Sequence, residues 1–584
     1  MLFVVSPFVT CTFPYPTVNN LKAILKKTNI TSEICYANIQ MKCKMNFSFY
    51  EELSDFFKFP DLAESVFASY AFPKEIKKHQ EFENNFKKNN VELFNKIQKV
   101  KDLAGSILAG IKDYITEKSP KIIWFDIYQN QLTSSIAIIN LIKTYLPNTI
   151  ITMGGLKCLS PMGDELLNAT TNIDYIFSGE PEIKFPEFCR EILNNKNLQT
   201  LESKKKIIHC DPINDISELP YPDFSDYIQQ LKSITTYKKI SFEGSRGCWW
   251  GEKSHCIFCG YNGKKNLFRK KVPERVHAEL DFLIDEYKPD VIHALDSNLP
   301  LDYPKKVFKN LKIGKKLKYF FYELSPQLKF HQLSILKDKS FNICQAGIET
   351  FDDDLLKILN KGTTALNNIR FLKDCRKLNI DIRWNFLYEI PGERDEMYYS
   401  MLELMPKIEH LQAPHDIRPL FITRFTPLHN DINAYKISNL KPYGGYQYFF
   451  PDIVNINNLA KYFTGKSFLT IQNRLLRNKF LSVANSWKIQ WEKKKKPKLE
   501  LINKNGHKFL IDTRQHKNSN LQLCKIGYNI IKLFQKPIPE ARIPEYISNK
   551  THFQIFQNFI AKDFIVKVGN NYLSIVLTHD NKTG

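Results

Sequence analysis

Residues 243–263, EGSRGCWWGEKSHCIFCGYNG, hold three cysteines, Cys248, Cys256 and Cys259, with seven residues between the first pair and two between the second. Interspersed glycines let such a loop fold around a small metal centre. Thiolate ligands select zinc, copper(I) or iron–sulfur clusters, and a set of three leaves one coordination position open. An open position indicates catalysis rather than a purely structural metal.

Structural zinc is the alternative interpretation of this loop. Cys-x2-Cys is common in zinc sites, and His255 beside Cys256 would supply a fourth ligand. A zinc ribbon normally has a second Cys-x2-Cys pair, whereas the next cysteines, Cys344 and Cys375, are isolated. The surrounding sequence therefore favours a cluster without removing the zinc alternative.

The segments RGCWWG, HCIFCG and YNG resemble a subfamily of cobalamin-dependent radical S-adenosylmethionine (SAM) enzymes that mature ribosomally synthesised peptides, many of them C-methyltransferases. The seven-residue spacing is that of this subfamily, and Phe258 resembles the aromatic residue found there. The resemblance implies that Cys248, Cys256 and Cys259 bind a [4Fe–4S] cluster whose fourth iron binds SAM.

The composition is that of a soluble globular protein, and 584 residues suffice for about three domains. The net charge of +22 suits an anionic partner, and an RNA-modifying enzyme is one alternative that it suggests. The lysines are scattered, however, and only KKKKPK at 493–498 is a cluster, interpreted as a solvated linker.

Localisation is predicted to be cytoplasmic. Nine of the twelve cysteines are dispersed without a paired framework, as expected in a reducing compartment. The apolar start is interpreted as a first strand, and no apolar run approaches the ~20 residues that span a bilayer.

Residues 1–215 are predicted to form an α/β, Rossmann-like domain with a helical insertion at about 48–118 and a helix opened by Thr133. Near-continuous apolar strands between helices predict a parallel sheet covered on both faces. The predicted strands are 2–8, 32–40, 121–128, 149–155 and 174–180, the last of which closes the sheet.

Ligands of such a sheet lie beyond the carboxyl ends of its strands. MGGLKCLSPMGDELL and DYIFSGEPEIKFPEF look like the cobalamin-binding domain of the same subfamily, although Gly154 and Gly155 could merely turn the chain. No Asp-x-His-x-x-Gly motif supplies a histidine to cobalt, and Leu156 and Lys157 depart from the relatives. The candidate cobalamin contacts are Ser6, Pro7, Gly154, Gly155, Ser178, Gly179 and Glu180.

Residues 216–430 are predicted to form the partial (β/α)6 barrel of radical SAM enzymes, with strands at 238–244, 290–297, 319–324, 341–350, 380–390 and 416–426. LDSN, QAGIET, YEIPGE and RFTPLH resemble blocks of the subfamily. Active-site residues are expected at the strand ends, although packing or capping is the alternative for each. The candidate SAM contacts are Phe258, Gly260, Asp296, Asn298, Glu323, Glu349 and Asn385, with Gln345, Tyr388 and Arg424 beside them.

The last third of the chain is predicted to hold a helical extension, 431–498, with a helical stretch at 455–492, and a winged-helix-like α+β domain, 499–584. YGGYQYFFP within 441–451 could line the substrate entrance or pack between domains. The winged helix could bind an acidic leader peptide by strand addition, or serve as a dimerisation or lid domain.

The predicted activity is C-methylation of an unactivated peptide carbon with a [4Fe–4S] cluster, SAM and cobalamin as cofactors. The expected partners are a ribosomally synthesised precursor peptide and an electron donor such as flavodoxin or ferredoxin, without nucleic acid or membrane. A non-methylating rearrangement or cyclisation is one alternative, and a cobalamin- or metal-binding sensor is another.

Overall fold

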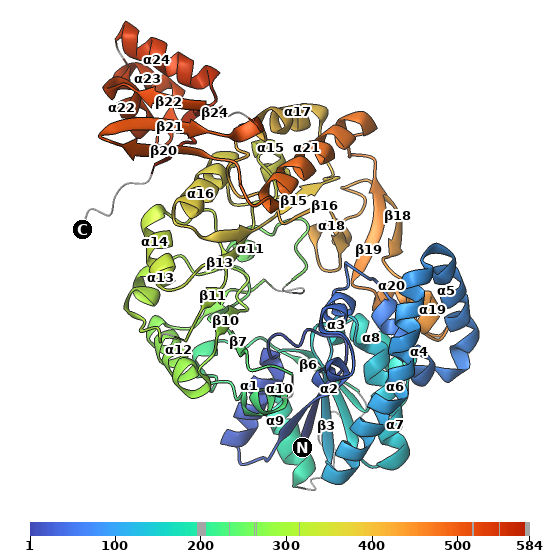
Figure 1. Ribbon diagram of the computed structural model, residues 1–584. Coiled ribbons are helices and arrows are strands. Elements are labelled where there is room, and N and C mark those ends of the chain that lie inside the picture. The colour runs from blue at the N-terminus through green and yellow to red at the C-terminus, as the bar shows by residue number, and fades with distance from the viewer. Residues whose placement is uncertain are drawn as a thin grey trace.

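The computed structural model describes residues 1–194, 206–232, 234–261, 263, 266–314, 316–516, 519–547 and 549–578. It has three parts: an N-terminal α/β domain, a curved set of parallel strands with helices outside it, and a smaller C-terminal domain (Figure 1). The C-terminal domain lies at the end of the curved set that is remote from the N-terminal domain (Figure 1).

The N-terminal domain is built on one parallel six-stranded sheet, so the predicted α/β class is confirmed. The strand order is β2-β1-β3-β4-β5-β6, which reverses direction between β1 and β3. Ligands bind at such a reversal, beyond the carboxyl ends of the strands. The strands are β1 (Leu2–Val5), β2 (Glu33–Tyr36), β3 (Ile122–Asp126), β4 (Ile150–Gly154), β5 (Tyr175–Gly179) and β6 (Ile207–Cys210).

Two strand predictions for this sheet are wrong in detail. β5 does not close the sheet, because the short strand β6 pairs beside it. The strand predicted at 32–40 ends at Tyr36, where α2 (Ala37–Cys43) begins and buries Ile39 and Met41. Both errors arise in segments of four strand residues, which are too short for a clear periodic signal.

Helices occupy the region of the predicted insertion and pack on α7 (Leu132–Tyr145). Buried Glu64 of the insertion accepts hydrogen bonds from Leu132 N (3.1 Å) and Thr133 N (2.8 Å), which compensates the unpaired amides at the start of α7. Thr133 therefore lies inside the first turn rather than capping it. The insertion helices are α3 (Phe47–Ser54), α4 (Leu62–Ala71), α5 (Ile76–Asn89) and α6 (Val91–Lys118).

The second part is a partial barrel of six parallel strand positions, in chain order, as the sequence predicts. Two of the predicted strands are each interrupted by one residue, Tyr322 and Trp384, whose side chains are buried. The strands are β7 (Lys239–Phe242), β10 (Val291–Ala294), β11 (Tyr319–Phe321) with β12 (Glu323–Leu324), β13 (Ile343–Ala346), β14 (Asp381–Arg383) with β15 (Asn385–Tyr388), and β16 (Asp416–Pro419). The outer helices are α12 (Pro273–Tyr287), α14 (Phe330–Asp338), α15 (Asp353–Ile358), α16 (Ala365–Lys377) and α17 (Asp395–Leu404).

An antiparallel sheet follows the barrel, in the order β17 (Ile422–Thr423), β19 (Tyr462–Ser467), β18 (Ile437–Pro442). The helical prediction for 455–492 is therefore correct for α20 (Ile456–Leu459) and α21 (Arg474–Glu492) but not for β19.

The aromatic segment that the sequence singled out includes α19 (Tyr446–Phe449) and packs against the N-terminal insertion. Phe449 contacts Phe82 with ring centres 4.8 Å apart, and Phe450 contacts Phe72 at 5.3 Å. These contacts are interdomain packing, the second of the two alternatives considered for this segment.

The C-terminal domain contains a sheet in the order β22-β21-β20-β26, a three-stranded sheet and two longer helices. Lys373 of α16 donates to Ser574 O at 2.7 Å, and His410 Nε2 lies 2.8 Å from Ile575 O, so buried polar groups join this domain to the barrel. Its main elements are β20 (Leu499–Lys504), β21 (His507–Asp512), β22 (Ser519–Leu523), α22 (Lys525–Leu533), α24 (Lys550–Ala561), β24 (Ile565–Val568), β25 (Asn571–Ser574) and β26 (Leu577–Thr578).

Among the described residues, no helix has both the length and the apolar character needed to cross a membrane.

Candidate active site

The cysteine loop leaves the barrel at the carboxyl end of β7 and is anchored there by a buried carboxyl group. Asp296 accepts hydrogen bonds from Gly244 N (2.7 Å), Ser245 Oγ (2.7 Å) and Tyr322 OH (2.8 Å). Burial raises the pKa of Asp296 to about 7, although these donors act to lower it. Asp296, predicted to contact SAM, is thus placed where it fixes the base of the loop.

The three cysteines lie in one neighbourhood. The Cys248 Sγ accepts a hydrogen bond from Gly251 N at 3.4 Å, and Cys259 N donates to Cys256 O at 3.2 Å. Burial raises the pKa of Cys256 to about 11 and also raises that of Cys259. The charge of Cys248 raises both pKa values further, so the three sulfurs are within electrostatic reach of one another.

This donor set fits a cluster better than a zinc ion. In the described part of the chain, no three His, Cys, Asp or Glu side chains gather around a single metal position. A structural zinc needs four ligands on one ion, whereas a cubane spreads three thiolates over three irons. His255 is already engaged, because its Nε2 lies 2.6 Å from Cys259 O.

The loop is held from both sides by the barrel. Ile257 N donates to Leu359 O at 3.2 Å, and Leu428 N donates to Ile257 O at 3.1 Å. A Cβ on Gly260 would lie 2.5 Å from Arg424 O, so only glycine permits this close approach. The Arg424 guanidinium donates to Ala460 O at 2.7 Å.

Lys361, which the sequence analysis did not single out, brings a positive charge to the thiols. Its Nζ lies 3.2 Å from Glu349 Oε1 and 5.9 Å from the centre of the Phe258 ring. Burial acts to lower the pKa of Lys361, but the charges of Glu349, Cys256 and Glu323 outweigh it and hold the pKa above its usual value. The local sequence, LNKG at 359–362, contains no signal that separates Lys361 from an ordinary surface lysine at the end of a helix.

The remaining candidate SAM contacts lie along the barrel strands. Burial raises the pKa of Glu323 to about 7, and Gln345 Nε2 donates to its carboxylate at 3.4 Å. The buried Asn298 Oδ1 has no hydrogen-bond partner in the described structure and is available to a ligand. Asn385 begins β15 and Tyr388 ends it, so Tyr388 and not Asn385 lies at the carboxyl end of this strand.

The predicted cobalamin contacts on β1 and β4 make structural contacts. The buried Ser6 hydroxyl bonds to Ser135 Oγ at 2.8 Å, and Pro7 O accepts from Ser134 Oγ at 3.2 Å. Gly154 packs on Trp124, where a Cβ would lie 2.0 Å from the ring, and Gly155 has a φ of 96°.

The candidates on β5 connect to neighbouring segments. Ser160 N donates to Ser178 Oγ at 3.2 Å, and Gly179 has a φ of 127° in which a Cβ would meet Cys210 O at 2.0 Å. Glu180 forms ion pairs with arginines that flank the cysteine loop.

Other groups at this rim fit an amide-rich ligand such as the corrin edge. Gln129 Oε1 and Asn130 Oδ1, just beyond β3, are buried acceptors without a partner among the described residues. Tyr15 and Tyr128 lie beside them with ring centres 4.3 Å apart, at the reversal between β1 and β3. Corrin carboxamides are donors that the two acceptors could bind.

Tyr261, two residues after Cys259, interacts electrostatically with groups of both domains. Its side chain is 65% exposed, and burial nevertheless raises its pKa. Its electrostatic neighbours are Cys259 and Glu323 on the barrel side and Tyr15 and Tyr128 on the rim. The tertiary structure alone identifies this residue, since the sequence presents it as one more loop tyrosine.

Comparisons with known proteins agree with this architecture. Residues 242–405 match the profile of the Radical SAM superfamily, so the barrel is a radical SAM domain, the type that uses a [4Fe–4S] cluster and SAM. The chain is 22% identical over 327 residues to an uncharacterized methyltransferase of Pyrococcus horikoshii, covering 53% of this chain and 68% of that protein. It is 24% identical over 263 residues to the bacteriochlorophyllide d C-8(2)-methyltransferase of Chlorobaculum tepidum, covering 42% and 55%.

Two solved structures share the fold over most of the chain. The cobalamin-dependent SAM radical enzyme OxsB, with aqua-cobalamin and SAM bound, has a TM-score of 0.55 at 14% identity and covers 97% of this chain and 76% of its own. The radical SAM methyltransferase TsrM from Kitasatospora setae, with cobalamin and a [4Fe–4S] cluster, has a TM-score of 0.53 at 12% identity and covers 83% and 88%.

Proposed function

We propose that this chain is a cobalamin-dependent radical SAM methyltransferase that acts on an unactivated carbon of a ribosomally synthesised peptide. The observation that carries the proposal is that Cys248, Cys256 and Cys259 share one loop, whose Tyr261 interacts electrostatically with Cys259 and with the Tyr15–Tyr128 rim. When bound, the cluster and SAM supply a 5′-deoxyadenosyl radical, and cobalamin supplies the methyl group.

The protein residues bind and orient these groups. The three thiolates hold the cluster, and Lys361 offsets part of their negative charge while Glu349 holds the lysine in place. Gln129 and Asn130 offer acceptors to the corrin amides on the opposite side.

Methyl transfer is tested with methyl-deuterated SAM and a precursor peptide encoded beside the gene. Anaerobically reconstituted enzyme is expected to deliver the label to the peptide and to form 5′-deoxyadenosine. Cys256→Ala should abolish both products and lower the iron content. Cys344→Ala, at a buried cysteine remote in sequence from the loop, is the matched control and should keep its iron.

Each rival function predicts a different product pattern. A modified but unlabelled peptide would indicate rearrangement or cyclisation instead of methylation. Cobalamin binding without SAM cleavage, unchanged in Cys256→Ala, would indicate a sensor.

We also propose that the C-terminal domain binds the leader segment of the precursor as an added strand on β22. β22 is an edge strand in the sheet order, and Ser519, Asn520 and Gln522 are exposed on it. Lys504 is exposed on β20, two strands away from β22, and Lys525 is exposed at the start of α22, which follows β22; these positive charges suit an acidic leader. An electron donor such as flavodoxin or ferredoxin is the other proposed partner, since the cluster must be reduced.

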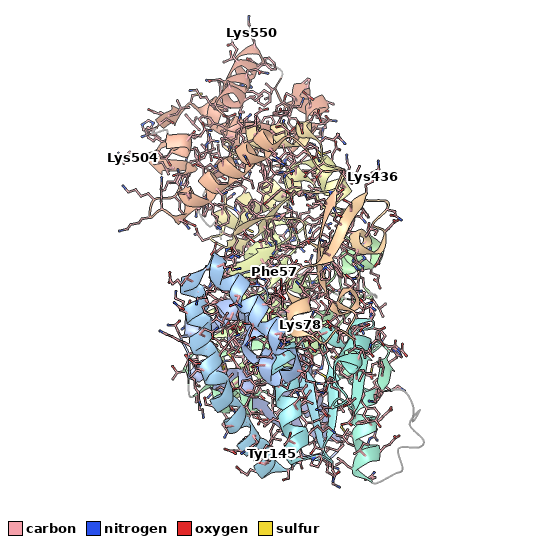
Figure 2. All side chains as sticks on the ribbon, turned by 90° about the vertical axis from the view of Figure 1, so that its right-hand side faces the viewer. Phe57, Lys78, Tyr145, Lys436, Lys504 and Lys550 are labelled. Carbon is pink, nitrogen blue, oxygen red and sulfur yellow. The ribbon has the colours of Figure 1, made fainter. Side chains whose placement is uncertain are left out.

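Leader binding is tested by fluorescence anisotropy with a labelled acidic leader peptide and the full-length chain. Lys504→Glu with Lys525→Glu should weaken binding and reduce its dependence on salt. Lys436→Glu is the control, since Figure 2 shows Lys436 on the extension after the barrel and Lys504 on the C-terminal domain, both directed to solvent. Equal binding by both variants would place the leader elsewhere.

A further inference from the structure

Asn360 makes four hydrogen bonds to the cysteine loop. Its backbone carbonyl accepts from Trp250 Nε1 at 2.8 Å and from the Cys256 thiol at 3.5 Å. Its side-chain Oδ1 accepts from Ser254 Oγ at 2.8 Å, and its Nδ2 donates to His255 O at 2.9 Å. Three consecutive loop residues, 254–256, are thus held by a single residue of another element.

The backbone at Asn360 is suited to this position. Asn360 follows the last turn of α15 with a left-handed φ of 57°, and Lys361 N closes the helix end by donating to Leu356 O at 2.9 Å. Asparagine tolerates this conformation better than most residues. A Cβ on Gly362 would lie 2.5 Å from the Trp250 ring, so the same turn also packs tightly on the loop.

We propose that Asn360 is a positioning residue that fixes Cys256 relative to Cys248 and Cys259 and thereby controls how firmly the cluster is retained and at what potential it is reduced. The inference rests on the proposed function, because it presupposes the cluster. When Cys256 loses its proton to bind iron, its bond to the Asn360 carbonyl is lost. The hydrogen bonds from the Asn360 side chain to Ser254 and His255 then keep residues 254–256 in position.

Asn360→Gly removes both amide bonds and keeps the left-handed backbone accessible. Iron release to a chelator from the reconstituted full-length protein is expected to be roughly tenfold faster, as the loss of two ordinary hydrogen bonds predicts. The matched control is Asn379→Gly. Asn379 follows α16 with a φ of 52° and is exposed, and none of its bonds in the described structure reaches the cysteine loop.

Asn360→Asp tests whether residue 360 lies close enough to the cluster to affect its reduction potential. The aspartate can still accept from Ser254 but cannot donate to His255 O, and it adds a negative charge beside the cluster. The midpoint potential from a redox titration followed by electron paramagnetic resonance is expected to fall below that of Asn360→Gly. Because the added charge alone lowers the potential, the positioning role is judged from Asn360→Gly, whose midpoint potential should differ from those of wild type and Asn379→Gly.

The failures of the two proposals can be told apart. Wild-type protein that assembles no cluster would refute the proposed function and this inference with it. A wild-type cluster combined with wild-type iron release in Asn360→Gly, or with the same midpoint potential in wild type and Asn360→Gly, would overturn this inference alone.

Discussion

The Glu180 carboxylate, one residue beyond β5, accepts a hydrogen bond from Arg269 at 2.7 Å and another from Arg246 at 2.8 Å. The two arginines face each other on the antiparallel strands β8 (Ser245–Arg246) and β9 (Arg269–Lys270). Burial acts to raise the pKa of Glu180, but the guanidinium groups outweigh it and hold the pKa below its usual value. This ion pair joins the first domain to the base of the cysteine loop.

Glu180→Gln should loosen that junction. The substitution removes the charge that the two guanidinium groups share, although Arg246 keeps its ion pairs with Glu182 and Glu243, and a cost of about 2 kcal/mol is expected. Hydrogen exchange should become faster in β8 and β9. Glu187→Gln, at an exposed position on α9 (Lys184–Leu193), is the control, and equal protection in both variants would contradict the expectation.

Gly260→Ala should displace the loop at its last cysteine. The added Cβ would lie 2.5 Å from Arg424 O and 2.7 Å from Thr423 Cγ2, so overpacking of about 1–3 kcal/mol is expected. Iron bound per chain after reconstitution should fall. Gly314→Ala, where no atom lies within 4 Å of the added Cβ, should retain wild-type iron; a full iron content in Gly260→Ala would argue that the loop adapts.

Lys361→Met should lower the reduction potential of the cluster. Removing a positive charge beside the thiolates makes the added electron less favourable, by an amount on the order of tens of millivolts. Redox titration of the reconstituted protein measures the shift. Lys357→Met serves as the control because Lys357 is exposed and pairs with Asp354 at 3.0 Å, and the two variants should differ.

Lys157→Met should change how stability depends on pH. Burial lowers the pKa of Lys157 to about 7, from a usual value of 10.5, while its Nζ donates to the Tyr446 hydroxyl at 2.9 Å. Between about pH 7 and 10.5 the folded state therefore binds fewer protons than the unfolded state, and this group makes stability rise with pH by up to about 1.4 kcal/mol per unit.

The check is a comparison of denaturant midpoints at pH 7 and pH 9. Wild type should gain more stability over this interval than Lys157→Met does. Lys121→Met, at an exposed position before β3, should behave like wild type. The same gain in all three proteins would show that Lys157 stays charged in the folded state throughout this interval.

Several features could be predicted from local sequence because each depends on near neighbours along the chain. The apolar runs at 122–126 and 150–154 are long and flanked by helical patterns, and both are buried strands. The short strand β6 and the chain after Tyr36 were mispredicted because four-residue segments carry little periodic information.

The residues of the candidate site also fall into two groups, those whose place could be predicted from local sequence and those whose contacts could not. Asp296 and Glu323 lie near the cysteine loop, as expected from their places after barrel strands. The positions of Ser6 and Glu180 at strand ends did not indicate what their side chains contact, because Ser135 and Arg269, their partners, come from distant segments.

The three candidate thiol ligands and the order of the α/β units could be predicted from the sequence alone, since Cys248, Cys256 and Cys259 fall within twelve residues and strand periodicity is local. Contacts formed in the folded chain bring Lys361 and Asn360 beside the thiols and bring Tyr261 within electrostatic reach of Tyr15 and Tyr128. Those contacts join residues about a hundred or more positions apart, and burial and electrostatics act through space rather than along the chain.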